Sequence, residues 1–130
     1  MASTAYLSGL FDGEGCITIR RAKDRSARRG LTYSLLVDAS QKKPEVLREF
    51  EKRWGGSILK GQRCMRWQVY SERAATALIE MLPHLIVKKA EARVAIDFQM
   101  RKREGPAKSI SDELFGSYEK AYLELRRLKA

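Results

Sequence analysis

Residues 6–19 read YLSGLFDGEGCITI. Leu7, Leu10 and Phe11 are spaced so that they form one apolar stripe along a short helix. The helix ends in Asp-Gly-Glu-Gly, and residues typical of a strand follow at once. Each glycine costs a helix roughly 1 kcal/mol relative to alanine, so this ending stabilises the helix poorly, but it leaves a carboxylate free to hold a metal ion. The segment predicts a short helix that carries an acid to the start of a strand.

The face of this helix away from the apolar stripe has few side chains. Gly9 and Gly13 are one helical turn apart, and Ser8 and Asp12 lie beside them. Small residues allow two helix backbones to approach closely, so we expect this face to pack against another helix. A glycine cap at the helix end is the simpler interpretation. It explains Gly13 or Gly15, but it does not explain Gly9.

The composition indicates a folded, basic protein. The chain has 130 residues, of which 44% are hydrophobic, and its net charge is +10. This length suits a single domain over residues 1–130, with a core over about residues 3–104 and a C-terminal helix over about residues 109–129. The charge predicts a polyanionic partner, with nucleic acid favoured over a membrane surface.

Other classes of protein are disfavoured by the same composition. No apolar run is long enough to span a bilayer and no signal peptide is evident, so we expect an intracellular protein, cytoplasmic or organellar, that is not secreted. Cys16 and Cys64 have no metal-binding spacing, which fits a reducing compartment. His84 is the only histidine, so a histidine triad or a histidine-based zinc site is disfavoured.

The hydrophobic periodicity predicts alternating helices and strand pairs. Gly55 and Gly56 are expected to end a helix that begins at Pro44, and Pro83 is expected to begin the long helix. Ser109 and Ser111 are candidate caps for the last helix. The predicted strands are 16–22, 31–40, 57–62 and 64–70, and the predicted helices after the first are 44–54, 71–82, 83–103 and one beyond 109. The order is αββαββα followed by a C-terminal helix, which predicts an α+β fold with a four-stranded antiparallel sheet.

The segment from Leu7 to Gly15 resembles the signature of the LAGLIDADG homing endonucleases. Ser8 stands in place of the usual Ala, and Glu14 in place of the usual second Asp. The order of elements is also similar, so the resemblance extends over residues 5–100 but not to the last helix. It implies a sheet that is covered by helices on one face and binds DNA with the other.

Polar and basic side chains follow the predicted open face of this sheet and its loops. Arg, Gln and Asp can pair with base edges in the major groove, and loop cations can contact phosphates. The exterior of any half-exposed sheet is also polar, so each residue taken singly has an ordinary alternative interpretation. The expected DNA-binding residues are Thr18, Arg20, Lys23, Arg25, Arg28, Arg29, Thr32, Ser34, Asp38, Lys60, Arg63, Arg66 and Gln68.

A chain with one signature implies, by resemblance, a homodimer. The faces formed by Ser8, Gly9, Asp12 and Gly13 would pack across a two-fold axis, with Asp12 capping the partner's signature helix. Two Glu14 carboxylates would then lie close together and repel. By resemblance, Glu14 and the Gly13 carbonyl would bind Mg²⁺, which favours oxygen ligands, with Mn²⁺ or Ca²⁺ able to substitute in binding.

Two further catalytic residues are implied by resemblance. Gln41 stands where the family often has a Gln that orders water, and Lys88 stands where it has a Lys near the scissile phosphate. Gln41 is equally well interpreted as a helix cap, and Lys88 as a solvated helix residue. Glu45 departs from the family pattern, because relatives have a basic residue there.

The expected function is therefore a sequence-specific, Mg²⁺-dependent endodeoxyribonuclease. Such an enzyme would make a staggered double-strand break with 3′ overhangs in a long, near-palindromic site of double-stranded DNA. The first alternative is a non-cleaving DNA- or RNA-binding protein of the same fold, such as a maturase with intron RNA as a partner or a transcription regulator. A small basic ribosome- or RNA-associated protein would explain the charge but not Gly9, Gly13 and Glu14.

Overall fold

The computed structural model describes residues 2–103 and 110–130. Its order of elements confirms the predicted α+β, αββαββα fold with a C-terminal helix. The elements are α1 (Thr4–Glu14), β1 (Gly15–Lys23), β2 (Leu31–Gln41), α2 (Glu45–Trp54), β3 (Ser57–Lys60), β4 (Met65–Tyr70), α3 (Ser71–Met81), the short 3₁₀ helix η1 (Leu82–His84), α4 (Lys89–Lys102) and α5 (Asp112–Lys129).

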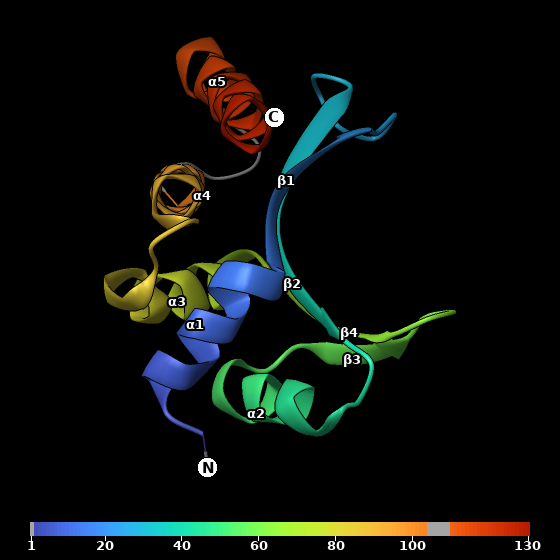
Figure 1. Cartoon of the computed structure of the whole chain (residues 1–130). Coiled ribbons are helices and arrows are strands. Elements are labelled where there is room, and N and C mark those ends of the chain that lie inside the picture. The colour runs from blue at the N-terminus through green and yellow to red at the C-terminus, as the bar shows by residue number, and fades with distance from the viewer. Residues whose placement is uncertain (1, 104–109) are drawn as a thin grey trace.

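The four strands form one antiparallel sheet in the order β1-β2-β4-β3. Val37 lies at its centre, where it pairs with Ile17 on one side and Val69 on the other. The sheet is curved, and all the described helices lie on one side of it, so its other face is uncovered (Figure 1). The predicted division into a covered and an open face is confirmed.

The core lies between the covered face of the sheet and the helices. Every second residue of β2 is buried, as the alternation predicts: Tyr33, Leu35, Val37 and Ala39. At the other end of the sheet, Trp67 is fully buried and stacks on Phe50 of α2 with the ring centroids 4.8 Å apart. The Trp67 indole donates a hydrogen bond to the Gly55 carbonyl at 2.8 Å. The glycine turn after α2 is thereby fixed to the sheet.

The turn after α2 requires glycine for its backbone conformation. Gly55 and Gly56 have φ angles of 78° and 90°, which side chains disfavour. A Cβ on Gly56 would also lie 2.3 Å from the Gln68 carbonyl oxygen. The predicted end of the helix at this pair is confirmed.

The predicted long helix from Pro83 to about residue 103 is wrong at its start. Leu82–His84 form a single 3₁₀ turn, Leu85 is extended and buried, and α4 begins only at Lys89. Burial of Leu85 draws the chain out of the helical path. The cap of the next segment comes from Asp12, which lies far away in the sequence. The hydrophobic periodicity of the segment reveals neither the burial of Leu85 nor the hydrogen bonds to Asp12.

Several predicted boundaries shift by one or two residues. The hairpin strands are shorter than predicted, ending at Lys60 and resuming at Met65. Pro44 lies just before α2, where its carbonyl accepts a hydrogen bond from the Arg48 N–H. Ser111 caps α5 by accepting from the Leu114 N–H, and the other candidate cap, Ser109, lies outside the described residues.

The C-terminal helix α5 packs on the covered side of β1 and β2. The ring of Tyr33 on β2 contacts Phe115, Tyr118 and Tyr122 of α5, with centroids 5.6 to 6.3 Å apart. Burial and a hydrogen bond to Glu119 raise the pKa of Tyr33 to about 12. No described helix is long and apolar enough to cross a bilayer.

Candidate functional site

The junction of α1 and β1 holds the predicted acid at the edge of the sheet. Ser3 caps the start of α1 by accepting a hydrogen bond from the Tyr6 N–H at 3.1 Å. The helix passes into β1 with no intervening residue, and the Gly15 N–H donates to the Phe11 carbonyl. A Cβ on Gly15 would lie 2.2 Å from the buried ring of Phe11. Glycine therefore allows the direct passage that leaves Glu14 exposed at the helix end.

Asp12 binds a segment of its own chain. Its carboxylate accepts hydrogen bonds from the backbone N–H groups of Ile86, Val87 and Lys88 at 2.9, 3.0 and 2.9 Å. Partial burial alone would raise the pKa of Asp12, but these hydrogen bonds and the Lys88 charge together lower it. Within the subunit, Asp12 therefore holds the segment of residues 86–88 in place. Its expected role as a cap of the partner's helix stays a prediction.

The predicted Lys88 lies beside the signature helix. Its ammonium donates a hydrogen bond to the Asp12 carbonyl at 2.9 Å, and its backbone N–H is one of the three that Asp12 binds. The last carbonyls of a helix have no partner within the helix, and Lys88 satisfies one of them. A residue far away in the sequence is thus held two positions from Glu14.

Strand register brings Gln41 to the same end of β1. Ala39 pairs with Gly15, and β2 runs antiparallel to β1. Gln41 therefore lies two residues beyond Gly15 along the sheet, on the side from which α1 enters. It pairs with Met65 and is half-buried. Strand register thus puts Gln41 at the end of the sheet where α1 enters, and Lys88 bonds to α1 itself.

The donors at this end of α1 fit part of a magnesium site. An exposed carboxylate on Glu14 and the free carbonyl of the last helical turn at Gly13 are hard oxygen ligands, which Mg²⁺ prefers. Within residues 2–103 and 110–130, no three His, Cys, Asp or Glu side chains cluster in a way that could hold a metal.

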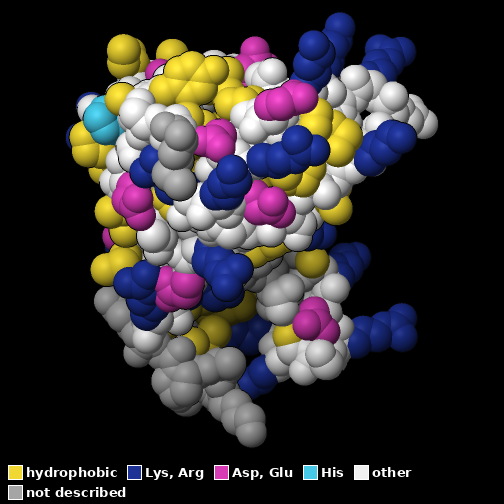
Figure 2. Space-filling view, turned by 90° about the horizontal axis from the view of Figure 1, so that it is seen from below, with side chains coloured by type: hydrophobic (Ala, Val, Ile, Leu, Met, Phe, Trp, Pro, Cys, Tyr) yellow, Lys and Arg dark blue, Asp and Glu magenta, His cyan; other side chains and the backbone are white. Residues whose placement is uncertain are grey.

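The open face of the sheet carries most of the predicted polar residues. Arg20, Thr32 and Arg66 are exposed there, and Thr18, Ser34, Asp38 and Gln68 are half-buried. Burial raises the pKa of Asp38, and the nearby charges of Arg66 and Lys129 offset part of this effect. The exposed loop cations are Lys23, Arg25, Arg28, Lys60 and Arg63. In Figure 2, Lys and Arg side chains project along the right margin, which is the side of the uncovered sheet face in Figure 1.

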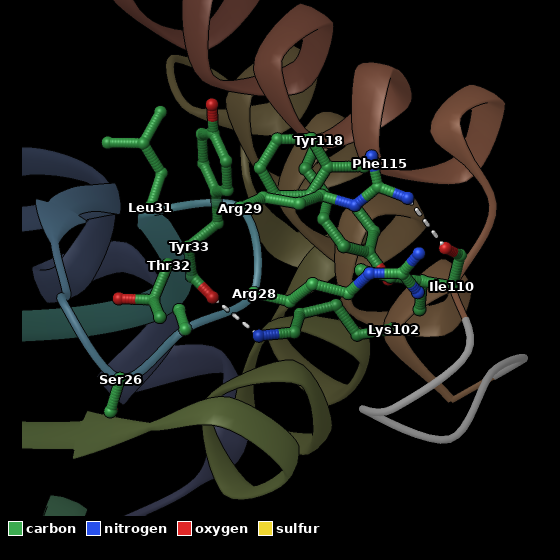
Figure 3. A pocket seen from close by; sticks show the side chains of 11 residues that line it. Ser26, Arg28, Arg29, Leu31, Thr32, Tyr33, Lys102, Ile110, Phe115 and Tyr118 are labelled. Carbon is green, nitrogen blue, oxygen red and sulfur yellow. Dashed lines mark hydrogen bonds between the residues drawn. The ribbon is translucent and has the colours of Figure 1, made fainter.

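Arg29 is an exception among the predicted loop cations. Its guanidinium turns under α5, where it donates to the Ile110 carbonyl at 2.9 Å, pairs with Asp112 and lies 5.1 Å from the Phe115 ring (Figure 3). The side chain is only 23% exposed. Its expected phosphate contact is corrected to a structural role, because α5 supplies partners that the loop sequence does not reveal.

The predicted bare face of α1 is partly confirmed. Gly9 and Gly13 are exposed, and a Cβ on either would meet nothing within 4 Å. Ser8, however, is fully buried and donates to the Thr4 carbonyl at 2.6 Å. Ser8 is therefore removed from the expected partner-facing surface.

Two features near this site were missed by sequence reasoning. Ile86 and Val87 are 86% and 72% exposed, although they were predicted to lie within a helix. Lys129, at the end of α5, reaches the edge of β1 and donates to the Ile17 carbonyl at 2.8 Å. Nothing local in the sequence indicates either feature, because Asp12 holds the first and the packing of α5 on β1 places the second.

The fold and this site together define an αββαββα protein with an open basic sheet face and an acid at the end of its first helix. A family model described as LAGLIDADG endonuclease matches residues 7–98. The chain belongs to the LAGLIDADG endonuclease family. No curated protein sequence matches it.

Solved structures of similar fold include several homing endonucleases. I-CvuI in complex with the I-CreI target, uncleaved in 2 mM Mg, is 18% identical, with 96% of this chain and 80% of that chain covered and a TM-score of 0.85. The archaeal intron-encoded I-Vdi141I complexed with DNA is 19% identical, with 96% and 82% covered and a TM-score of 0.83. I-SmaMI, bound to uncleaved DNA with calcium ions, is 15% identical, with 98% and 46% covered and a TM-score of 0.84. At these identities the likeness establishes the fold.

Proposed function

We propose that this protein is a site-specific, Mg²⁺-dependent DNA endonuclease that acts as a homodimer. The observation that carries the proposal is the position of Glu14. Its exposed carboxylate ends the family's signature helix where that helix enters a sheet with an uncovered, basic face. A carboxylate so placed can hold a metal against a nucleic-acid backbone lying on that face.

The open face has the chemistry to bind duplex DNA. A curved antiparallel ribbon can enter the major groove, where Arg pairs with guanine, Gln with adenine, and Asp accepts from cytosine. Arg20, Gln68 and Asp38 offer these groups, and the exposed cations at both ends of the sheet would contact phosphates. The DNA complexes of I-CvuI and I-Vdi141I, which share this fold, support the assignment.

A second copy of the chain would complete the site. Packing within the subunit does not require glycine at positions 9 and 13, because a Cβ at either would meet nothing within 4 Å. Close approach of another helix explains both glycines. Ile86 and Val87 stand exposed beside the end of α1, fixed there by Asp12, and their apolar surface suits burial in the same contact. Two copies would also approximate the length of I-SmaMI, of which this chain covers 46%.

The catalytic roles follow from the positions of the side chains. Glu14 and the Gly13 carbonyl would hold Mg²⁺, which when bound lowers the pKa of water and neutralises charge on a phosphate. Gln41 would orient water at the same end of the sheet. Lys88, held by the Asp12 carbonyl, would place a positive charge beside the phosphate. The chain's contribution is positioning and electrostatics.

Two related sites across a two-fold axis would cut both strands. The product would be a staggered double-strand break with 3′ overhangs, in a target of near-palindromic sequence that mirrors the symmetry of the protein.

The second candidate is a non-cleaving DNA- or intron-RNA-binding protein of the same fold. It is favoured by Glu45, an acid at the exposed start of α2, where the resemblance implies a basic residue.

The test is selection of cleaved sequences from a randomised duplex library. Wild-type protein would be incubated with the library in Mg²⁺, and a parallel reaction with Glu14→Gln would report background breakage. We expect recovery of one near-palindromic site with 3′ overhangs from the wild type only. Specific binding without cleavage would favour the second candidate, and no enrichment of any sequence would contradict both.

A further inference from the structure

The last turn of α5 reaches the edge of the sheet next to the candidate site. Lys129 donates to the Ile17 carbonyl of β1 at 2.8 Å, and its ammonium lies 3.3 Å from the Cys16 sulfur and 3.4 Å from the Thr18 hydroxyl. β1 is an edge strand, and Cys16 and Thr18 project on the open face, opposite to the buried Ile17. The ammonium therefore lies at the free edge of β1. It bonds to the third residue after Glu14 along the chain.

This helix lies outside the matched part of the family model, which ends at residue 98. Several contacts hold it against β1 and the core. Arg21 of β1 pairs with Glu119 at 2.8 Å and lies 4.5 Å from the Tyr122 ring, and Leu125 is buried in the core. These contacts hold the last turn of α5 at the edge of β1. The C-terminus accordingly lies beside β1 in Figure 1.

The Lys129 ammonium can exchange its weaker contacts for another ligand. Its three N–H donors are directed at the Ile17 carbonyl at 2.8 Å, the Cys16 sulfur at 3.3 Å and the Thr18 hydroxyl at 3.4 Å. The last two acceptors are weak or distant, so a phosphate oxygen would replace either of them. Among the described residues, no carboxylate forms an ion pair with Lys129, whereas its neighbour Arg127 pairs with Glu124 at 2.6 Å. The Asp38 carboxylate on the neighbouring strand is close enough to feel the Lys129 charge, but it forms no ion pair with it. An exposed cation at the edge of the proposed nucleic-acid-binding face is suited to a phosphate oxygen.

We propose that Lys129 is a phosphate-contacting residue that extends the DNA-binding face onto α5. Its ammonium bridges the Ile17 carbonyl on the edge of β1 and one backbone phosphate near Glu14, and it thereby positions the backbone as well as adding affinity. This inference rests on the proposed function, because it requires that DNA lies on the open face. It assigns a role to a helix that the family model does not include.

The experiment compares Lys129→Gln and Lys129→Arg with the wild type. The matched control is Lys120→Gln, because residues 120 and 129 are two and a half turns apart and lie on opposite sides of α5. Affinity for a mixed-sequence DNA duplex would be measured over a series of salt concentrations, together with the thermal midpoint of each variant. The salt slope counts phosphate contacts at about −0.9 each.

We expect Lys129→Gln to reduce the magnitude of the salt slope by about 0.9 per bound subunit, with Lys129→Arg and Lys120→Gln close to the wild type. A role confined to holding α5 would instead lower the thermal midpoint of Lys129→Gln and leave its slope unchanged, which would overturn the inference while the proposed function stands. A wild-type protein that does not bind the duplex would overturn both.

Discussion

At the scale of single residues, the glycines of the signature segment serve different purposes. Gly15 is required within the subunit, because any side chain there would enter the space of the Phe11 ring. Gly13 is not required within the subunit, because a Cβ there would meet nothing within 4 Å. Substitution by alanine should therefore separate folding from association.

We expect Gly15→Ala to lower the free energy of unfolding by about 2 kcal/mol through overpacking. Gly13→Ala should leave the unfolding of the isolated subunit unchanged within about 1 kcal/mol but should weaken the dimer. Urea denaturation and sedimentation equilibrium measure the two effects. Equal behaviour of the two variants in both measurements would show that the glycines do not differ in this way.

Asp12 should stabilise the fold in a pH-dependent manner. Its pKa in the folded chain lies below the ordinary value of 3.8, so its contribution is complete above that value and is lost as the pH falls through the lower folded-state pKa. Asp12→Ala removes the acceptor of three backbone N–H groups, and we expect a loss of about 2 kcal/mol near neutral pH. The difference from the wild type should shrink in acid below the ordinary pKa, as measured by urea unfolding over a pH series. A difference independent of pH would contradict this role.

At the scale of secondary-structure elements, the sequence pattern predicted those features that depend on neighbouring residues along the chain. The alternation along β2 and the glycine pair after α2 were sufficient, because burial of every second side chain and positive φ angles are properties of short segments. The start of α4 and the path of Arg29 were not predictable in this way. Asp12 and α5 determine them, and both lie far away in the sequence.

The arginines of the loop between β1 and β2 should have two different roles, contact with DNA and stabilisation of the fold. Arg25 and Arg28 are exposed, so replacing either with Gln should reduce the salt slope of DNA binding by about 0.9 per subunit and leave stability unchanged. Arg29→Gln should instead lower stability by about 1 kcal/mol, because it loses its bonds to Ile110 and Asp112. Binding titrations and thermal unfolding of the three variants measure this. A reduced slope for Arg29→Gln alone would reverse the assignment.

At the scale of the whole molecule, one corner of the subunit combines the end of α1 with an exposed apolar pair. Glu14 ends α1 there, Lys88 bonds to Asp12 two positions before it, and strand register puts Gln41 at the same end of the sheet. The exposed pair Ile86 and Val87 adjoins the same corner and was not anticipated, since its exposure depends on the hydrogen bonds to Asp12. Both features are explained by a second copy of the chain.

Introducing a charge at this apolar pair should separate the subunits. We expect Ile86→Glu to weaken dimerisation at least about tenfold, which corresponds to 1.4 kcal/mol, because a carboxylate would be buried against the partner. Leu123→Glu is the matched control, since Leu123 is exposed on α5, away from α1 (Figure 1). Sedimentation equilibrium on both variants checks the prediction. Dissociation caused by the control but not by Ile86→Glu would place the interface elsewhere.

The most direct test of the central claim is the cleavage rate of Glu14→Gln on the selected target in Mg²⁺. Because the amide removes the negative ligand and keeps the size of the side chain, we expect cleavage to fall at least about a hundredfold, with affinity for the same duplex close to that of the wild type. Cleavage by Glu14→Gln at the wild-type rate would contradict the account, because Glu14 would then have no part in the reaction.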